Sequence, residues 1–295
     1  MASRSSRLVA AAVVVLCAAV LAGCTRGHPE DRLTIVDKSD YVALGDSYTA
    51  VSGAGPYTDK VCLRSETDYP ALVAAKLAIT SFTNASCAGA SSTDLLTRQI
   101  TSSGSNPPQL DSLTRTTKTV TIGLGLNDSG ISYYLISVCL PIEGAAKDAV
   151  SPNCTAYLKQ PEAGIPQVID ALRQGVLDDL HSVRERAPKA RIVLVGYPRL
   201  LPATGSCPDQ LPLPRVALER ARAAGSLVNE AMKAAATSAG ADFIDMYTAS
   251  KGHDLCSDDP WVNGYKAIPG KALALHPFPT YHRAVADRVV ALLDK

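Results

Sequence analysis

One serine stands directly after an apolar run near the start of the chain. The stretch YVALGDSYTA, residues 41–50, ends its apolar part at Gly45 and continues with Asp46 and Ser47. A serine hydroxyl at the end of a strand can attack a carbonyl carbon when a nearby base removes its proton. Most serines in such positions cap a helix or stabilise a turn. Ser47 therefore needs partners elsewhere in the sequence before it indicates catalysis.

A histidine is the usual base for a serine nucleophile, and the chain has five histidines. His276 precedes a proline and a helical pattern, while His253 has Asp254 beside it. His276 is the favoured base, and His253 is its rival. Of the remaining histidines, we expect His28 in a tether and His181 on a helix surface. We expect His282 to cap a helix or to pack in the core.

Four segments resemble the sequence blocks of the GDSL/SGNH hydrolases, in the order found in that family. GDSYTA resembles the first block and contains Ser47, and ASCAGASSTDLL resembles the second and contains Gly89. IGLGLNDSG resembles the third with Asn127, and LHPFPTYH resembles the last with His276. The resemblance extends along most of the chain. It implies ester hydrolysis through an acyl-enzyme on Ser47, with His276 as the base.

The same resemblance implies an oxyanion hole. Ester cleavage builds negative charge on the carbonyl oxygen, so hydrogen-bond donors must be fixed where that charge develops. The expected donors are the backbone N–H of Ser47, that of Gly89 and the side-chain amide of Asn127. Glycine suits a close approach of the backbone because it has no Cβ. The alternatives are a simple turn at Gly89 and a local turn of Asn127 with Asp128 and Ser129.

The sequence departs from the family pattern in one respect. Many members have an acid three residues before the histidine, whereas this chain has Leu273 there. Secreted actinobacterial-type relatives replace the acid with a backbone carbonyl and carry three disulfides and a WxN segment, which here is Trp261–Gly264. We therefore expect a Ser47–His276 dyad in which a main-chain oxygen, most simply that of Leu273, holds Nδ1–H. A more distant acid remains the alternative: Asp254, Asp258 or Asp259.

Six of the eight cysteines follow the N-terminal segment, and an even number in an exported protein indicates disulfides. No two of them lie close enough in sequence for a typical zinc site, so we expect no metal. Spacing alone leaves the connectivity open. The family resemblance implies sequential pairing: Cys62–Cys87, Cys139–Cys154 and Cys207–Cys256. The first pair would brace the loop after Ser47 against the segment that leads to Gly89.

Short apolar runs alternate with helical patterns along the rest of the chain. The expected strands are 41–45, 81–89, 118–125, 191–198 and 241–247, and the expected helices are 68–79, 91–100, 165–183, 215–239 and 280–292. This alternation predicts an α/β protein, namely a three-layer α/β/α sandwich with a five-stranded parallel sheet, and the resemblance implies the flavodoxin-like SGNH-hydrolase fold. Ligands bind at the carboxyl ends of such strands. Cys139–Gly164 and Leu200–Pro214 look like insertions, and the proline-rich residues 198–214 are expected to form a surface loop rather than the frame of a cleft.

The N-terminus has the features of an export signal. Two arginines precede a 15-residue apolar run at 8–22, shorter than the roughly 20 residues that cross a bilayer. LAGC, at Leu21–Cys24, resembles the bacterial lipoprotein box, in which the cysteine thiol is acylated. We therefore expect a lipoprotein signal peptide at 1–23, a polar tether at 24–39 and a hydrolase domain at 40–295. Lipidation of Cys24 would place the protein on the extracytoplasmic side of the cell membrane, with part of it secreted.

The charge balance excludes one class of partner. The formal net charge is +1 and no run of lysine and arginine occurs, so a nucleic-acid partner is not expected. We expect a monomer without a cofactor that acts on a small-molecule or lipid ester as an esterase or lipase. The alternatives are a carbohydrate O-deacetylase or phospholipase of the same fold, and a non-catalytic binding lipoprotein.

Overall fold

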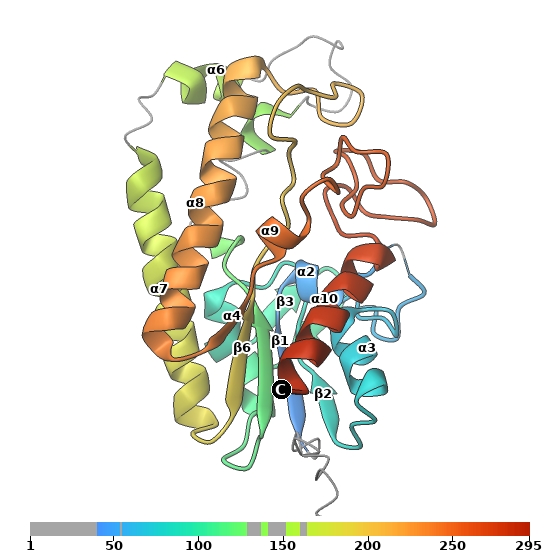
Figure 1. The fold of residues 1–295 in the computed structure, drawn as a ribbon, viewed down its shortest axis with the longest axis vertical. Helices are drawn as coiled ribbons and strands as arrows, with labels where there is room; N and C mark the ends of the chain where they lie inside the picture. The colour runs from blue at the N-terminus through green and yellow to red at the C-terminus, as the bar shows by residue number, and fades with distance from the viewer. Residues whose placement is uncertain (1–39, 54, 129–136, 141–151, 160–163) are drawn as a thin grey trace, which may run out of the picture. The chain divides into compact units, whose positions relative to one another are not determined.

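The computed structural model describes residues 40–53, 55–128, 137–140, 152–159 and 164–295 (Figure 1). The predicted signal peptide and the predicted tether, with Cys24, lie outside these residues. No helix within them is long and apolar enough to cross a membrane.

Five strands form one parallel sheet in the order β2-β1-β5-β6-β7. The strands are β1 (Tyr41–Gly45), β2 (Phe82–Asn84), β5 (Thr119–Gly123), β6 (Arg191–Val195) and β7 (Asp242–Ile244). This is the flavodoxin-like order, and it confirms the predicted architecture. The chain reverses its direction of winding between β1 and β5, which is where ligands bind in such sheets. Ser47 follows β1, and Asn127 follows β5.

Helices cover both faces of the sheet, which confirms the three layers (Figure 1). Alternate residues of the buried strands point to opposite faces, so Val42 packs with one set of helices and Tyr41 with the other. One face carries α4 (Ser92–Leu96), α7 (Gly164–Arg186) and α8 (Arg215–Ala239), and the other carries α3 (Tyr69–Lys76) and α10 (Pro279–Leu293). The predicted helix 215–239 is confirmed at both ends, and Gly240 ends it with a φ of +64°.

The sequence prediction extended one helix too far. Residues 99–100 were expected to end a helix, but α4 stops at Leu96. Gln99–Thr101 and Gly104–Asn106 instead pair as the antiparallel strands β3 and β4. The buried side chain of Gln99 holds this hairpin to the core, because its Nε2 donates to the carbonyl of Ala88 at 2.9 Å.

Short helices complete the described residues. They are α2 (Ser47–Ala50), η1 (Gln109–Ser112), η3 (Ser137–Cys139), α6 (Pro152–Lys159) and α9 (Met246–Ala249). The three disulfides pair as expected: Cys62–Cys87, Cys139–Cys154 and Cys207–Cys256. Much of the segment Cys139–Gly164 lies outside the described residues. The segment Leu200–Pro214 is more than a surface loop, since Leu201, Leu211 and Leu213 are buried.

Candidate active site

Ser47 opens a short helix at the carboxyl end of β1. Asp46 is the N-cap of α2, and its carboxylate Oδ1 accepts a hydrogen bond from the Tyr48 N–H at 2.8 Å. The other carboxylate oxygen accepts a hydrogen bond from the Tyr197 hydroxyl. Burial raises the pKa of Asp46 to about 7, although both hydrogen bonds favour the charged form. Asp46 therefore acts as a hydrogen-bond acceptor that fixes this loop, and Ser47 itself is only 8% exposed.

The turn between β1 and Ser47 requires a glycine and a polar clamp. Gly45 has a φ of +151°, and a Cβ there would lie 2.3 Å from Thr49 Oγ1 and 2.5 Å from the Gly123 carbonyl. Gln109, on η1, holds both backbone groups of Gly45: its Oε1 accepts from the N–H at 2.8 Å and its Nε2 donates to the carbonyl at 2.9 Å. The sequence offered no signal for Gln109, because a partner 64 residues away has no local pattern.

His276 is oriented by a backbone carbonyl, as expected, but not by the residue predicted. Its Nδ1 lies 2.6 Å from the carbonyl oxygen of Ala274. The choice of Leu273 was wrong, because the Leu273 carbonyl accepts hydrogen bonds from Asn263 Nδ2 and from the His276 N–H. Leu275 adopts a φ of +57° between the two, a left-handed conformation that is uncommon for leucine. This turn lets the Ala274 carbonyl face the imidazole two residues later.

The WVNG segment holds this turn in place. Asn263 Nδ2 donates to the carbonyl of Lys266 at 2.8 Å and to that of Leu273 at 2.9 Å, and the Asn263 N–H donates to the His276 carbonyl. The Leu275 N–H donates to the Gly264 carbonyl at 2.9 Å, which ties down the strained residue. Asn263 is therefore a positioning residue for His276. Its type and spacing were noticed in the sequence, but its partners could not be deduced from them.

No acid contacts His276 within the described residues. Asp254 Oδ1 accepts from the Cys256 N–H, and Asp259 pairs with His253 at 3.3 Å. His253 also stacks on Trp261 with ring centroids 4.2 Å apart, so the rival histidine is part of a surface cluster. Burial lowers the pKa of His276, and the Ala274 hydrogen bond opposes that shift.

Two predicted oxyanion donors have no competing partner. Among the described residues, neither the Ser47 N–H nor the Gly89 N–H donates a hydrogen bond to any atom. Gly89 has a φ of +76°, while a Cβ there would meet only Gln99 Nε2 at 3.9 Å. Backbone conformation rather than crowding by neighbours thus requires a glycine at this position.

Asn127 connects two of the predicted segments. Its Nδ2 donates to the carbonyl of Ala90 at 2.8 Å, which ties the end of β5 to the Gly89 loop. That bond uses one of the two N–H groups of the amide and leaves the other for a ligand. The neighbouring Asp128 binds the N–H and hydroxyl of Ser92 at the start of α4.

Tyr48 links the serine segment to the histidine segment. Its hydroxyl donates to the Leu275 carbonyl at 2.7 Å, and its ring stacks with that of His276 at a centroid distance of 6.0 Å. The Cys87 N–H donates to the Gly45 carbonyl, which brings the Gly89 loop to the same edge of the sheet. No hydrogen bond joins the side chains of Ser47 and His276 in the part of the chain that the structure describes.

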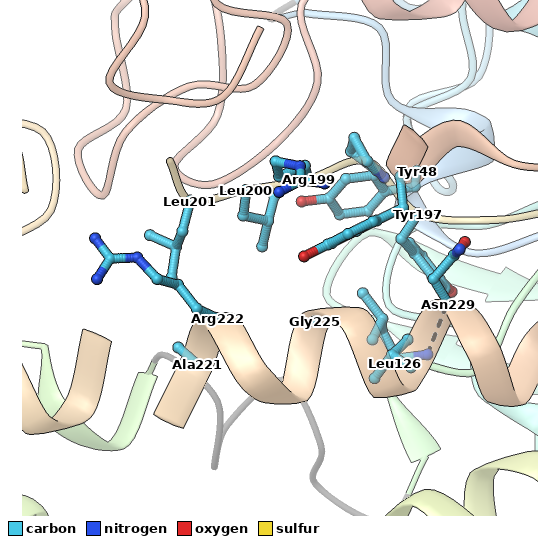
Figure 2. Close-up of a pocket in the computed structure, with 13 residues that line it drawn as sticks. Tyr48, Leu126, Tyr197, Arg199, Leu200, Leu201, Ala221, Arg222, Gly225 and Asn229 are labelled. Carbon is cyan, nitrogen blue, oxygen red and sulfur yellow. Dashed lines mark hydrogen bonds between the residues drawn. The ribbon is translucent and has the colours of Figure 1, made fainter. Parts of the chain in front are cut away.

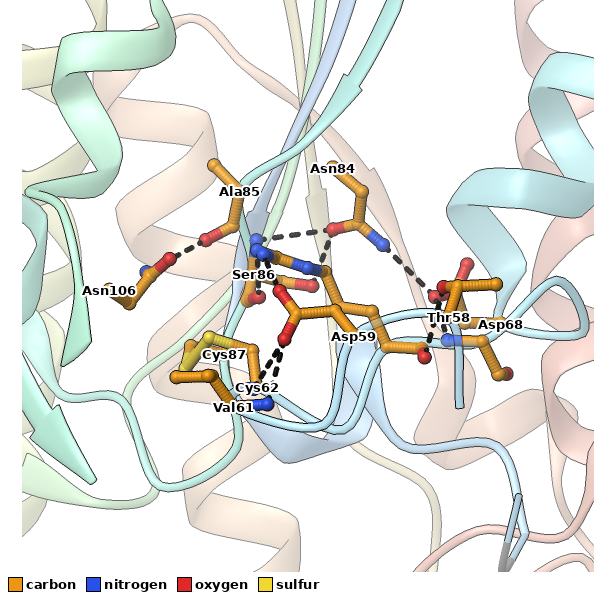
Figure 3. A network of polar contacts seen from close by, with 12 residues as sticks. Thr58, Asp59, Val61, Cys62, Asp68, Asn84, Ala85, Ser86, Cys87 and Asn106 are labelled. Atoms are coloured by element: carbon orange, nitrogen blue, oxygen red, sulfur yellow. Dashed lines mark hydrogen bonds and ion pairs between the residues drawn. A yellow bond between two sulfur atoms is a disulfide. The ribbon is translucent and has the colours of Figure 1, made fainter. Parts of the chain in front are cut away.

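The loop after Ser47 is held by a dense polar network, shown in Figure 3. Asp59 accepts hydrogen bonds from Val61 and Cys62 and pairs with Arg64, whose Nη1 donates to the Ser86 carbonyl at 3.0 Å. Asp68 accepts from the backbone of Ser65 and Ala71 and from Asn84 Nδ2. The Cys62–Cys87 disulfide lies beside this network, next to Val61. We call residues 55–68 and 84–87, with these contacts, the braced side.

His282, on α10, binds the start of α3 and the residue that follows α2. It is fully buried, its Nδ1 accepts from the Tyr69 N–H at 3.1 Å, and its Nε2 lies 2.8 Å from the Val51 carbonyl. Burial lowers its pKa to about 4. Of the two roles predicted for it, packing in the core is the one observed. His181 is exposed, as expected.

A pocket adjoins the residue after Ser47, because Tyr48 is one of its lining residues (Figure 2). Helix α8 forms one wall, and residues 198–201 face it across the pocket. Tyr48, Leu126 and Tyr197 close the end nearest the predicted catalytic residues. The first residues of the proline-rich segment therefore frame a cavity, so the expectation of a plain surface loop was wrong for them. In the described residues, no group of three or more His, Cys, Asp or Glu is arranged to hold a metal ion.

Comparison with known proteins places this chain among ester hydrolases. Residues 43–284 match the model of the GDSL-like Lipase/Acylhydrolase family. A lipase of Streptomyces rimosus is 35% identical over 234 residues, which cover 77% of this chain and 77% of the relative. The family match spans the segments that contain Ser47, Gly89, Asn127 and His276.

Solved structures agree with the sequence relatives. A phospholipase A1 from Streptomyces albidoflavus superposes with a TM-score of 0.68 at 28% identity, over 86% of this chain and 98% of that one. An extracellular lipase from Streptomyces rimosus superposes with a TM-score of 0.66 at 30% identity, over 84% of this chain and 99% of that one. The fold of the described residues is thus that of known lipases.

Proposed function

Because the chain belongs to the GDSL-like lipase/acylhydrolase family and is therefore a carboxylic ester hydrolase, we propose that it acts through an acyl-enzyme on Ser47. The observation that carries the proposal is the turn at Leu275. It aims the Ala274 carbonyl at Nδ1 of His276, while the Tyr48 hydroxyl binds the same turn from the residue next to Ser47.

His276 is the general base and acid of this proposal. With Nδ1–H held by the Ala274 carbonyl, the imidazole presents an unprotonated Nε2 that can take the proton of Ser47 Oγ. The serine oxygen then bonds to the ester carbonyl carbon, and the proton passes to the leaving alcohol. Water repeats the sequence on the acyl-enzyme and releases the acid. Because a carbonyl offers no full negative charge, the imidazolium is stabilised less than in a triad with an acid.

The oxyanion would be held by three donors. The Ser47 and Gly89 N–H groups and the remaining N–H of the Asn127 amide are the candidates. Replacing Asn127 by Ala should lower kcat by about 10²–10³-fold while KM changes little, because the donor acts on charge that develops in the transition state.

Turnover of p-nitrophenyl acyl esters of increasing chain length tests the proposal. Ser47→Ala should reduce kcat by on the order of 10⁴-fold or more and should block labelling by a fluorophosphonate. Substantial turnover by the correctly folded Ser47→Ala variant would exclude Ser47 as the nucleophile. If Asp254→Asn or Asp258→Asn cost as much as His276→Ala, an acid would complete a triad after all.

The pH profile provides a second test of the base. His276 must be neutral to accept a proton, and burial lowers its pKa below the usual 6.5. Activity should therefore persist as the pH falls below 6.5, and the acid limb of kcat/KM should have its midpoint lower than that value. An acid limb centred above 7 would indicate a charged partner beside His276.

We also propose that Cys24 is lipidated, so that the enzyme is exported and held on the outer face of the membrane. The LAGC sequence at Leu21–Cys24 supports this, and so does a relative that is an extracellular lipase. Two acyl chains on one thiol suffice for stable anchoring, whereas one is marginal. Cys24→Ser should move the protein from the membrane fraction to the medium, and unchanged membrane retention would argue against lipidation.

A phospholipid is the second candidate substrate. The observation in its favour is the similarity to a phospholipase A1 along nearly the whole of that chain. Release of fatty acid from short-chain phosphatidylcholine, compared with p-nitrophenyl esters of the same acyl length, separates the two candidates.

A further inference from the structure

The pocket of Figure 2 adjoins the predicted catalytic residues through three of its lining residues. Tyr48 follows Ser47, Leu126 precedes Asn127, and Tyr197 donates to Asp46. A substrate whose carbonyl reaches Ser47 can therefore extend part of its structure into this pocket. Much of the lining is apolar or aromatic, which suits the carbon chain of an ester.

Two arginines line the pocket, and none of its lining residues is acidic. Arg222 is already engaged, because its guanidinium donates to the carbonyls of Pro202 and Gly205. Arg199 is different. Its guanidinium carbon lies 4.3 Å from the ring centroid of Tyr247, and its side chain makes no hydrogen bond or ion pair within the described residues. Its Nε is buried without a hydrogen-bond partner.

The contact with the Tyr247 ring holds the Arg199 guanidinium, whose N–H groups make no hydrogen bond within the described residues. A planar guanidinium in this arrangement matches the two oxygens of a carboxylate or phosphate. A half-buried cation without an anionic partner loses hydration, and the contact with the Tyr247 ring offsets only part of that loss. Such an arrangement is costly in the free protein and becomes favourable when an anion binds.

Asn229 adds a second unpaired polar group to the same pocket. It projects from α8, is only 8% exposed, and its buried Oδ1 has no hydrogen-bond partner. Figure 2 shows it at the end of the pocket near Leu126. A buried amide oxygen without a partner is uncommon in a folded protein, and because it can only accept, it would bind a hydroxyl of the substrate rather than its anionic group.

We propose that this pocket binds an anionic group of the ester substrate, a carboxylate or a phosphate, on the guanidinium of Arg199. The inference rests on the proposed function and narrows its substrate class to esters that carry a negative charge beside the scissile bond. The carboxylate could be on the acyl chain, and the phosphate could be on the alcohol.

Two matched substrate pairs test the proposal and distinguish these sources. Mono-p-nitrophenyl glutarate against p-nitrophenyl pentanoate places the anion on the acyl side. Dihexanoyl phosphatidylglycerol against dihexanoylglycerol, below their micellar concentrations, places it on the alcohol side. The wild-type enzyme should favour the anionic member of one pair by about tenfold to a hundredfold in kcat/KM, as expected for a charge-assisted hydrogen bond. That preference should fall as salt is added.

Arg199→Met should abolish the preference, so that kcat/KM becomes about equal for the anionic and the neutral member of the pair, and Arg199→Lys should retain part of it. Arg215→Met is the matched control. It removes the same charge from α8, where Arg215 pairs with Glu219 in solvent, and should leave the preference unchanged.

Equal rates on both members of both pairs would overturn the inference without any variant, and hydrolysis of the neutral ester would still support the proposed function. An anionic preference that survives Arg199→Met would also overturn it. If no ester is turned over and Ser47 is not labelled, the proposed function fails. In that case, binding of hexyl phosphate by calorimetry in the wild type and its loss in Arg199→Met would still support the pocket, and equal or no binding would exclude it.

Discussion

Two regions beside the turn at Ser47 differ in whether their polar side chains have hydrogen-bond partners. On the braced side, the side chains pair with one another and with backbone groups, and the Cys62–Cys87 disulfide joins its two segments. The paired side chains are those of Asp59, Arg64, Asp68 and Asn84. We call the pocket of Figure 2 the open side, and there Arg199 Nε and Asn229 Oδ1 have no partner. A completed network makes a region rigid, whereas unpaired groups make it ready for a ligand. We infer that the braced side sets the geometry of catalysis and that the open side sets the choice of substrate.

Removal of the Cys62–Cys87 disulfide should have the largest effect on this contrast. The bond spans 25 residues, so Cys62→Ala/Cys87→Ala should lower the free energy of unfolding by about 3–4 kcal/mol. It should also lower kcat on a neutral ester, because Cys87 is two residues from Gly89 and its N–H binds the Gly45 carbonyl. Urea denaturation and p-nitrophenyl butyrate kinetics would measure the two effects.

The Cys207–Cys256 disulfide provides the matched control. It spans 49 residues and holds the 200–214 segment of the open side, so its removal should cost at least as much stability. Its loss should leave kcat on the neutral ester nearly unchanged and alter selectivity instead. An equal loss of kcat in both double variants would contradict the division between the two sides.

His282 gives the next largest effect, and that effect depends on pH. Its Nδ1 accepts from Tyr69 and its Nε2 faces the Val51 carbonyl, so only the neutral ring fits, and its pKa falls from 6.5 to about 4. The stabilisation is complete above 6.5 and is lost as the pH falls toward 4. His282→Gln should be less stable than wild type at pH 7 by about 1–3 kcal/mol, since it satisfies the two groups less well.

The difference in free energy of unfolding between wild type and variant should shrink by about 2–3 kcal/mol at pH 4.5. At that pH the unfolded wild type gains a proton on His282, whereas the folded wild type largely does not, so unfolding of the wild type becomes easier. Burial raises the pKa of Asp46, Asp68 and Asp179 to about 7, so these groups change stability with pH in the opposite direction in both proteins. These carboxyl contributions are the same in both proteins, so they cancel when the free energy of unfolding of the variant is subtracted from that of the wild type. An identical deficit at both pH values would show that His282 does not titrate on unfolding.

Tyr48 follows Ser47 and also lines the pocket of the open side. Its substitution should change stability and kcat by less than the changes described above. Tyr48→Phe removes the donor to the Leu275 carbonyl and should cost about 1–2 kcal/mol of stability. It should also lower kcat several-fold with little change in KM, because the turn that orients His276 loses a support. Tyr57→Phe is the control, since the Tyr57 hydroxyl makes only a 3.4 Å contact with the Gly53 carbonyl. Equal kinetic effects would mean that the link to Leu275 is not used.

The contrast between the sides also separates what the sequence could predict from what it could not. The strands, their order and the disulfide pairing were predictable, because apolar runs alternate with helical patterns and the sequence resembles a family with sequential pairing. Ala274 was not predictable as the partner of His276. That choice depends on the left-handed Leu275, which is held by the Gly264 carbonyl, a contact that tertiary structure alone provides.

The unpaired groups of the open side were equally invisible in the sequence. In the sequence, Arg199 is a single charged residue in a proline-rich segment, and Asn229 is a single polar residue in an alanine-rich helix. Only the approach of β6, α8 and α9 brings Tyr197, Asn229 and Tyr247 around one cavity. A residue that waits for a ligand has no local partner, so no local pattern can reveal it.

The smallest expected effect separates conformation from chemistry at Gly89. Its φ of +76° resembles the +64° of Gly240, which ends α8 far along the chain, and neither site would crowd a Cβ. Gly89→Ala and Gly240→Ala should each cost about 1 kcal/mol of stability, because alanine pays for a left-handed conformation. Only Gly89→Ala should also lower kcat, since a shift of its N–H displaces a proposed oxyanion donor. Equal kcat values in the two variants would mean that Gly89 is only a turn residue. The oxyanion donors would then be the Ser47 N–H and the Asn127 amide alone.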